Sequence, residues 1–191
     1  MRIHWNIPNL LTLLRIGLIP VFVGIFYLPA DVISLYWVNF SATLIFAVAA
    51  VTDWLDGWLA RRLNQTSAFG AFLDPVADKL MVAAALIVLV ELGRVGAVVA
   101  LIIIGREIAI SALREWMAAL GQGGSVAVAM IGKFKTGFQM AAILFLLYYE
   151  PLFGVNFFLV GTLLIYLAVV LTLVSMLYYL KAAREQLRQS V

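Results

Sequence analysis

The sequence contains no cysteine and a single histidine, His4. Without cysteine the chain can form no disulfide bond, and the shortage of thiolate and imidazole ligands argues against a zinc or copper centre. Charge is scarce as well: Asp, Glu, Lys and Arg make up 12% of the 191 residues, whereas about 25% is usual in soluble domains. Hydrophobic residues make up 65%, which excludes an ordinary soluble fold.

We therefore interpret residues 1–191 as a single all-α polytopic membrane domain with six transmembrane helices. A helix needs ~20 apolar residues to cross a ~30 Å hydrocarbon core. The expected spans run from about Leu10 to Leu28, from Tyr36 into Asp53–Asp56, from Ser67 to Leu92, from Val95 to Ala112, from beyond Lys135 to Glu150, and from Phe157 to Leu180. A short interfacial segment, Met1–Asn9, precedes them. No cleavable signal peptide is evident, because Arg15 interrupts the first apolar run.

Two residues predict how the third span starts. Ser67 is expected to cap its first turn. Pro75 is expected either to kink this helix or to mark its true beginning, because proline disrupts the interior of a helix and is tolerated in its first turn.

Basic residues are distributed unevenly between the two ends of the spans. The ends that follow the first, third and fifth spans carry only Arg94. The opposite ends carry Arg2, Arg61, Arg62, Lys79, Arg114, Lys133, Lys135, Lys181, Arg184 and Arg188. Basic residues remain in the cytoplasm, so we expect both termini and the acidic motif described next at the cytoplasmic face.

Four aspartates lie in two pairs within a short polar stretch between apolar segments. Asp53 and Asp56 are three residues apart, and Asp74 and Asp78 are four apart, so each pair lies on one helix face. Crowded carboxylates in a poorly hydrated site must either take up protons or bind cations. An all-oxygen donor set suits Mg²⁺ or Mn²⁺, which share ligands with substrate phosphates. Magnesium with a phosphate is the first interpretation.

The complete pattern is D-x2-D-G-x2-A-R-x8-G-x3-D-x3-D, which adds Gly57, Ala60, Arg61 and Gly70 to the aspartates. This pattern resembles the signature of the CDP-alcohol phosphatidyltransferases. The resemblance implies two divalent ions on the four aspartates, with Asp78 also acting as the general base. It also implies an in-line displacement that releases CMP, binding of the CDP-linked lipid near the two glycines, Ala60 and Arg61, and a homodimer.

Three polar residues recur at three-residue spacing in the first span: Asn9, Thr12 and Arg15. They share one helix face. One interpretation is ordinary polarity at a helix start with an arginine that extends to the interface. The alternative is that all three line the nucleotide or diphosphate site from the side, with Asn9 and Thr12 assigned to the binding of CDP-diacylglycerol.

A second charged group lies in the later spans. Arg106 and Glu107 interrupt the apolar run LIIIGREIAI, and charges at that depth normally face a cavity. Arg106 is interpreted, with Arg114, Lys133 and Lys135, as a basic pocket for a soluble phosphate. The alternatives remain open. Arg106 could form a mutually neutralising pair with Glu107 or extend to the interface. The two lysines could be topology anchors, and Arg114 could form a surface pair with Glu115.

Three further segments, Asn6–Ile16, Gly105–Trp116 and Gly132–Met140, resemble the bacterial members of that family that use sn-glycerol 3-phosphate. The expected reaction joins CDP-diacylglycerol to this acceptor and gives phosphatidylglycerol phosphate and CMP. The expected location is the bacterial inner membrane, with membrane lipids and no nucleic acid as further partners. The alternatives are a phosphatidylinositol-phosphate synthase, another acceptor, a membrane transporter and a non-catalytic scaffold.

Overall fold

The computed structural model describes residues 7–62, 68–119 and 130–189. Within these ranges the chain forms six α-helices and one short 3-10 helix. The helices are α1 (Ile7–Gly24), η1 (Ile25–Tyr27), α2 (Leu35–Arg62), α3 (Ala68–Glu91), α4 (Ala97–Ala119), α5 (Met130–Tyr148) and α6 (Phe157–Gln189). The predicted all-α architecture is confirmed for this part of the chain.

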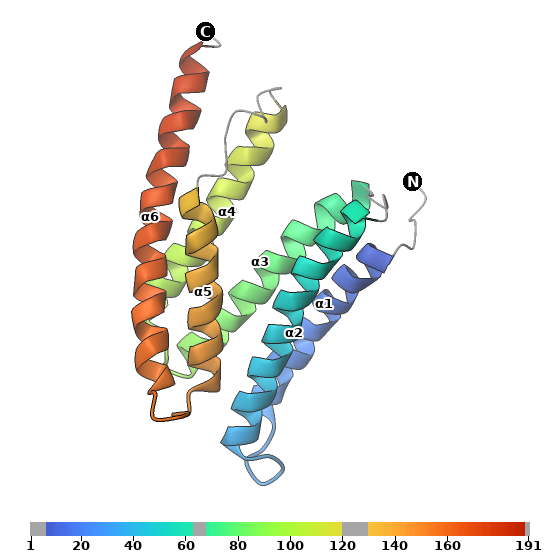
Figure 1. Cartoon of the computed structure of the whole chain (residues 1–191), viewed down its shortest axis with the longest axis vertical. Helices are drawn as coiled ribbons and strands as arrows, with labels where there is room; N and C mark the ends of the chain where they lie inside the picture. The colour runs from blue at the N-terminus through green and yellow to red at the C-terminus, as the bar shows by residue number, and fades with distance from the viewer. Residues whose placement is uncertain (1–6, 63–67, 120–129, 190–191) are drawn as a thin grey trace.

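Successive helices run in alternating directions (Figure 1). The helices α1, α2 and α3 lie on one side of the bundle, and α4, α5 and α6 lie on the other. The two groups are joined where α3 packs on α4 and where α2 packs on α5. The start of α1, the end of α2, the start of α3 and the end of α6 all lie at one end of the molecule.

The helix boundaries differ from the expected ones at several points. The first helix begins at Ile7 instead of Leu10, with Pro8 in its first turn, where proline's missing N–H costs nothing. The second helix is continuous through both aspartates of the first pair, as predicted. The third begins at Ala68 and contains Pro75, so it does not begin at this proline. The expected cap, Ser67, lies outside the described residues.

The core contains large apolar side chains from every helix. Buried examples, one from each helix in order, are Phe22, Phe46, Leu86, Ile103, Ile143 and Ile165. The closest approach is between α5 and α6. A Cβ placed on Gly161 would lie 2.8 Å from Cγ of Leu146, so only glycine fits there without a shift of the neighbouring helix.

Three helical segments are long and apolar enough to cross a membrane by length and composition. They are Asn9–Tyr27, Leu35–Asp53 and Phe157–Lys181, and Lys135–Tyr148 is a shorter apolar helix. The charges of α3 and α4, among them Asp74, Asp78 and Arg106, interrupt the apolar character of these two helices. Three segments of the described chain are therefore candidate membrane spans, and the six-span arrangement stays a prediction.

Arg94 lies between α3 and α4, at the end of the bundle opposite to the last turns of α2. Its side chain is buried. Its guanidinium donates to the carbonyl oxygens of Leu146 and Leu147 at 3.0 and 2.9 Å, and to Oδ1 of Asn39 at 2.8 Å. Its Cζ lies 4.2 Å from the centre of the Tyr149 ring. Burial lowers the pKa of Arg94. These contacts cap the end of α5, so this arginine has a structural explanation.

Candidate active site

The aspartates of the motif lie on adjacent helices, α2 and α3. Asp53 and Asp56 lie on the last turns of α2, and Asp74 and Asp78 lie one turn apart on α3. Asp53 and Asp78 are close enough to repel each other electrostatically. The two helices therefore direct at least these two carboxylates toward a common region, as the motif predicts. The side chain of Asp56 lies outside what the structure describes.

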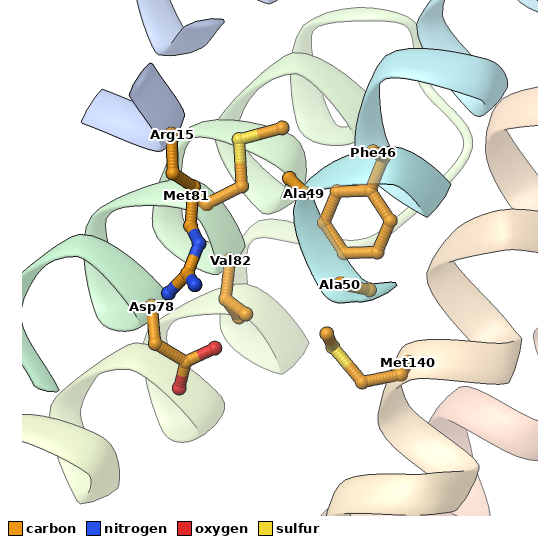
Figure 2. Close-up of a pocket in the computed structure, with 8 residues that line it drawn as sticks. All are labelled: Arg15, Phe46, Ala49, Ala50, Asp78, Met81, Val82 and Met140. Carbon is orange, nitrogen blue, oxygen red and sulfur yellow. The ribbon is translucent and has the colours of Figure 1, made fainter. Parts of the chain in front are cut away.

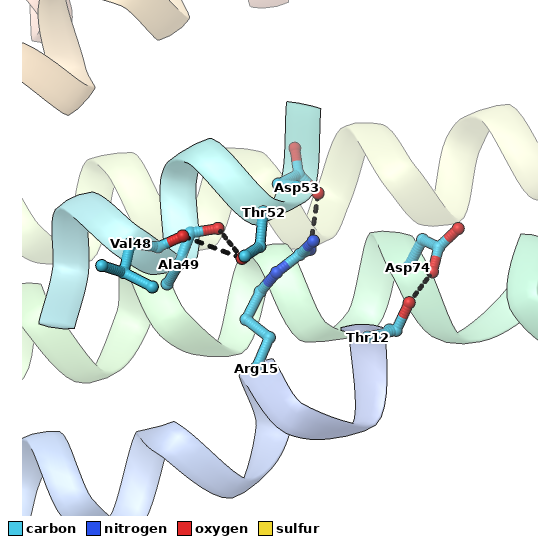
Figure 3. Close-up of polar contacts among 7 residues, drawn as sticks. All are labelled: Thr12, Arg15, Val48, Ala49, Thr52, Asp53 and Asp74. Carbon is cyan, nitrogen blue, oxygen red and sulfur yellow. Dashed lines mark hydrogen bonds and ion pairs between the residues drawn. The ribbon is translucent and has the colours of Figure 1, made fainter. Parts of the chain in front are cut away.

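The first helix places two side chains directly on this pair of helices. The Thr12 hydroxyl donates a hydrogen bond to Oδ1 of Asp74. The Arg15 guanidinium donates to Oδ1 of Asp53 at 2.5 Å, and the two contacts lie side by side in Figure 3. Thr12 and Arg15 are fully buried, at 0% and 1% exposure. The polar face of α1 thus lies against the aspartates, and Arg15 does not extend to the membrane interface.

The remaining residues expected to bind the lipid nucleotide are described unevenly. Asn9 is buried on α1, one turn before Thr12, and Gly70 is buried near the start of α3. The helical backbone of α2 includes Gly57, Ala60 and Arg61, but the surroundings of their side chains lie outside the described part. Their contacts with substrate remain predictions.

A small pocket, with a cavity volume of about 10 Å³, adjoins Asp78 (Figure 2). Its lining consists of Arg15, Phe46, Ala49, Ala50, Asp78, Met81, Val82 and Met140. Arg15 and Asp78 lie on one side and apolar side chains form the rest. Ligand pockets for drug-sized molecules measure about 300–1,000 Å³, so this pocket is too small for the whole lipid nucleotide. It surrounds Asp78 with low-polarity groups on the side that faces the core.

The second charged group is a cluster at the junction of α4, α5 and α6. The Lys135 ammonium donates a hydrogen bond to the Glu107 carboxylate, and the Arg106 guanidinium lies 3.7 Å from the same oxygen. Arg106 also donates to Oγ of Ser175 at 2.9 Å, and its Cζ lies 5.6 Å from the Tyr179 ring centre. The structure therefore places Arg106 against α6.

Lys135 and Glu107 are within electrostatic range of Asp78. The structure thus brings one of the four expected acceptor residues, Lys135, close to the motif. The side chains of Arg114 and Lys133 are not among those described.

Sequence reasoning did not assign two residues that the structure brings into these clusters: Ser175 and Tyr179. Arg15 was expected on the same helix face as Thr12, and its contact with Asp53 was not predicted. For α6 the signal was a polar stripe of Thr172, Ser175 and Tyr179 in an apolar helix, at spacings of three and four.

The carboxylate groups of the motif are of the ligand type that a divalent cation prefers. The motif supplies hard carboxylate oxygens from two helices, and the Arg15 guanidinium on Asp53 shows that a positive charge is stabilised at that carboxylate. Among the side chains that the structure describes, no three of the His, Cys, Asp and Glu type converge on one point. Since Asp56 is outside that set, a complete ligand group is not displayed.

These features, an all-α bundle with candidate membrane spans and one aspartate pair on each of the helices α2 and α3, define an integral membrane protein with a carboxylate-rich site. A family model described as CDP-alcohol phosphatidyltransferase matches residues 5–174. The chain belongs to the CDP-alcohol phosphatidyltransferase family. It is 55% identical over 186 residues to proteins of Escherichia coli (strain K12) and Shigella flexneri serotype 5b (strain 8401). Each alignment covers 96% of this chain and 98% of the relative. Both relatives are named CDP-diacylglycerol–glycerol-3-phosphate 3-phosphatidyltransferase.

Proposed function

We propose that this protein transfers the phosphatidyl group of CDP-diacylglycerol to the hydroxyl of sn-glycerol 3-phosphate. The products are phosphatidylglycerol phosphate and CMP, so the enzyme is a phosphotransferase of phospholipid biosynthesis. The observation that carries this proposal is the 55% identity, over 96% of the chain, to relatives that bear the name of this activity. The aspartate pairs and the neighbouring Lys135 supply the chemistry that such a reaction needs.

The four aspartates, Asp53, Asp56, Asp74 and Asp78, would hold two divalent ions, Mg²⁺ or Mn²⁺. The resemblance of the aspartate motif to that of the family implies such ions. When bound, such ions neutralise phosphoryl oxygens and stabilise the leaving CMP. The proposal is supported by the oxygen-only donor set and by the electrostatic repulsion between Asp53 and Asp78, which come from two different helices.

Asp78 is proposed as the general base. As the acceptor oxygen forms its bond to the phosphatidyl phosphorus, the bond from that phosphorus to the CMP oxygen breaks and the hydroxyl proton passes to the Asp78 carboxylate. This step needs a carboxylate within hydrogen-bond reach of the acceptor hydroxyl. Asp78 lies one turn beyond Asp74 on α3, beside the pocket and within electrostatic range of Lys135, which supports the assignment.

The lipid nucleotide would lie over the ends of α1, α2 and α3. Gly57, Ala60 and Gly70 would permit close approach of the cytidine, and Arg61 would pair with a phosphate. Asn9 and Thr12 would border the same site from α1. The hydrogen bond from Thr12 to Asp74 and the burial of Asn9 and Gly70 support this part.

The acceptor phosphate would be bound by the basic residues Arg106, Arg114, Lys133 and Lys135. The position of Lys135 supports this site most strongly, because its ammonium lies in range of both Glu107 and Asp78. Arg106 contacts Ser175 and Tyr179 of α6. A role in acceptor binding requires that its guanidinium also contact the acceptor phosphate. A phosphorylated acceptor explains why so many cations are needed, whereas an uncharged alcohol does not.

The reaction is proposed to take place at the cytoplasmic face of the bacterial inner membrane, with six spans and both termini inside. The distribution of Lys and Arg supports this orientation. The starts and ends of the helices support it as well, since α1 begins and α6 ends at the end of the bundle where α2 meets α3. Family resemblance further predicts a homodimer, which the molar mass of the detergent-solubilised protein would test.

The experiment that tests the proposed function compares acceptors side by side. Purified protein in detergent, with CDP-diacylglycerol and Mg²⁺, is given sn-glycerol 3-phosphate or inositol phosphate, and CMP release is measured. We expect release with sn-glycerol 3-phosphate at a rate at least about tenfold above that with inositol phosphate. Both acceptors carry a phosphate, but a polyol that does not match the site leaves polar groups unpaired, which costs about 1–3 kcal/mol. Preference for inositol phosphate would support the alternative synthase. No CMP release with any acceptor would favour a transporter or scaffold.

A further inference from the structure

Glu107 is the shared partner of two buried cations. Its carboxylate accepts the hydrogen bond of Lys135 and lies 3.7 Å from the Arg106 guanidinium. Lys135 is 2% exposed and Arg106 is 8% exposed, while the Glu107 side chain is 21% exposed. A single carboxylate on α4 thus contacts two cations, Arg106 on the same helix and Lys135 on α5.

The two cations depend on Glu107 to different degrees. Arg106 also donates to Ser175 and lies over the Tyr179 ring, so α6 holds it independently. Lys135 has a flexible four-carbon side chain, and Glu107 is the residue that fixes its ammonium by a hydrogen bond. Removing an ammonium from water costs several kcal/mol unless a counter-charge is present. The position of the Lys135 ammonium therefore depends on Glu107 more strongly than the position of the Arg106 guanidinium does.

The location of this pair connects it with the reaction. Asp78 is in electrostatic range of both Glu107 and Lys135. The ion pair thus joins α4 to α5 at a range from which its charges act on the proposed base on α3. Glu115 is exposed further along α4 and Glu91 is exposed at the end of α3, so neither occupies such a place.

We propose that Glu107 is a positioning residue for acceptor recognition, which holds the Lys135 ammonium beside Asp78 so that a phosphorylated acceptor meets a fixed cation near the base. The inference rests on the proposed function, in which Lys135 contacts the acceptor phosphate. Glu107 itself does not touch the acceptor and acts through the lysine. A negative charge near an anion site would by itself repel the anion, so the positioning effect must exceed that repulsion.

The first experiment measures steady-state kinetics of Glu107→Gln, which keeps the side-chain shape and removes the charge. We expect the KM for glycerol 3-phosphate to rise about tenfold, because the loss of one hydrogen bond to a charged group weakens binding by about this factor or more. The KM for CDP-diacylglycerol, and kcat at saturating acceptor, should stay within about twofold, because an interaction that serves acceptor binding alone leaves them unchanged. A lowered KM for glycerol 3-phosphate would show that repulsion dominates and would overturn the proposal. Equal increases for both substrates would also overturn it, because they indicate general damage.

A double-mutant cycle tests whether Glu107 acts through the lysine. Lys135→Gln should raise the KM for glycerol 3-phosphate, and adding Glu107→Gln to that variant should raise it no further. Equal effects of Glu107→Gln in both backgrounds would overturn the proposal. An unchanged KM in Lys135→Gln would overturn it too, while leaving the transfer reaction itself intact. Absence of wild-type turnover with glycerol 3-phosphate is a separate result that would reject the proposed function.

Two variants guard against misfolding and unspecific charge effects. Glu91→Gln makes the same change at an exposed carboxylate on the opposite end of α3, where Tyr27 donates to it at 3.0 Å, and should leave both KM values unchanged. Glu107→Asp keeps the charge and shortens the side chain by one methylene, so it should restore most of the acceptor affinity lost in Glu107→Gln. If Glu107→Gln fails to fold, the cycle is run with Glu107→Asp, whose smaller KM increase must likewise vanish in Lys135→Gln.

Discussion

Arg15 on the first helix donates a hydrogen bond of 2.5 Å to Asp53 on the second, with the guanidinium buried and the carboxylate 42% exposed. The first aspartate of the motif is thus paired with a cation that comes from a segment 38 residues earlier in the chain. Thr12, one turn before Arg15, makes the equivalent contact with Asp74. The position of α1 is therefore linked to the charges of both aspartate pairs.

Replacing Arg15 with Met should lower the stability of the protein in EDTA by about 1 kcal/mol, a modest value because water screens the exposed carboxylate of Asp53. For a chain of this size that is a fall of about 2–4 °C in melting temperature. Mg²⁺ should narrow the difference from wild type, because a bound ion supplies the missing positive charge. Thermal unfolding in detergent with and without Mg²⁺ measures this. Arg184→Met, at an exposed position of α6, is the control, and a difference that Mg²⁺ does not change would contradict the link.

Activity should require Mg²⁺ or Mn²⁺ and disappear in excess EDTA, because the motif presents only oxygen ligands. Asp53→Asn and Asp74→Asn should each lower turnover by orders of magnitude and weaken metal binding, and Asp56→Asn should do the same. Metal binding is measured directly by calorimetry on the folded variants. Full turnover in EDTA, or wild-type rates in these variants, would reject the assignment of the ligands.

Cysteines introduced into this cysteine-free chain report its orientation. A cysteine at Gln65 or at Gln189 should react with a membrane-impermeant thiol reagent only after the cytoplasmic side is opened. One at Asp31, an exposed residue in the turn after η1, should react in intact cells. Labelling of Gln65 from outside would place the aspartates at the wrong face for cytoplasmic substrates.

Gly161 should tolerate no side chain, because a Cβ there would lie 2.8 Å from Leu146. Gly161→Ala should cost about 1–3 kcal/mol, the usual cost of overpacking a filled interior. Gly17→Ala is the matched control, since nothing lies within 4 Å of its added Cβ. The control should be neutral or slightly stabilising, given the helix propensity of alanine. Equal melting temperatures of the two variants would show that α5 and α6 are not packed as described.

Hydropathy was enough to predict the order of the six helices and the continuity of α2 through Asp53. It did not predict the ends. Pro8 lies inside α1 because proline suits a first turn, and α6 continues to Gln189 because a polar sequence can extend a helix beyond an apolar span. The length of an apolar segment reflects the thickness of the membrane core. It does not determine how many flanking residues continue the helix.

The site was predictable where spacing within one helix decides the answer. The pairing of aspartates and the shared face of Thr12 and Arg15 are examples. Contacts between helices were not predictable, since spacing does not determine how one helix is rotated against another. Arg106 was expected among the acceptor residues, and its contact with Ser175, 69 positions later, depends on the packing of α4 on α6.

The central claim is that Asp78 acts as the general base in addition to its contact with the ions, and Asp78→Asn tests it most directly. A base acts only in the transition state, so its loss should reduce kcat while substrate and metal binding persist. The measurement is turnover of Asp78→Asn titrated with Mg²⁺, beside Asp53→Asn as a ligand variant. We predict that Asp53→Asn regains activity as Mg²⁺ rises, whereas Asp78→Asn stays inactive at every concentration. Recovery of Asp78→Asn to near the wild-type rate at high Mg²⁺ would contradict the base role and leave Asp78 as a fourth ligand.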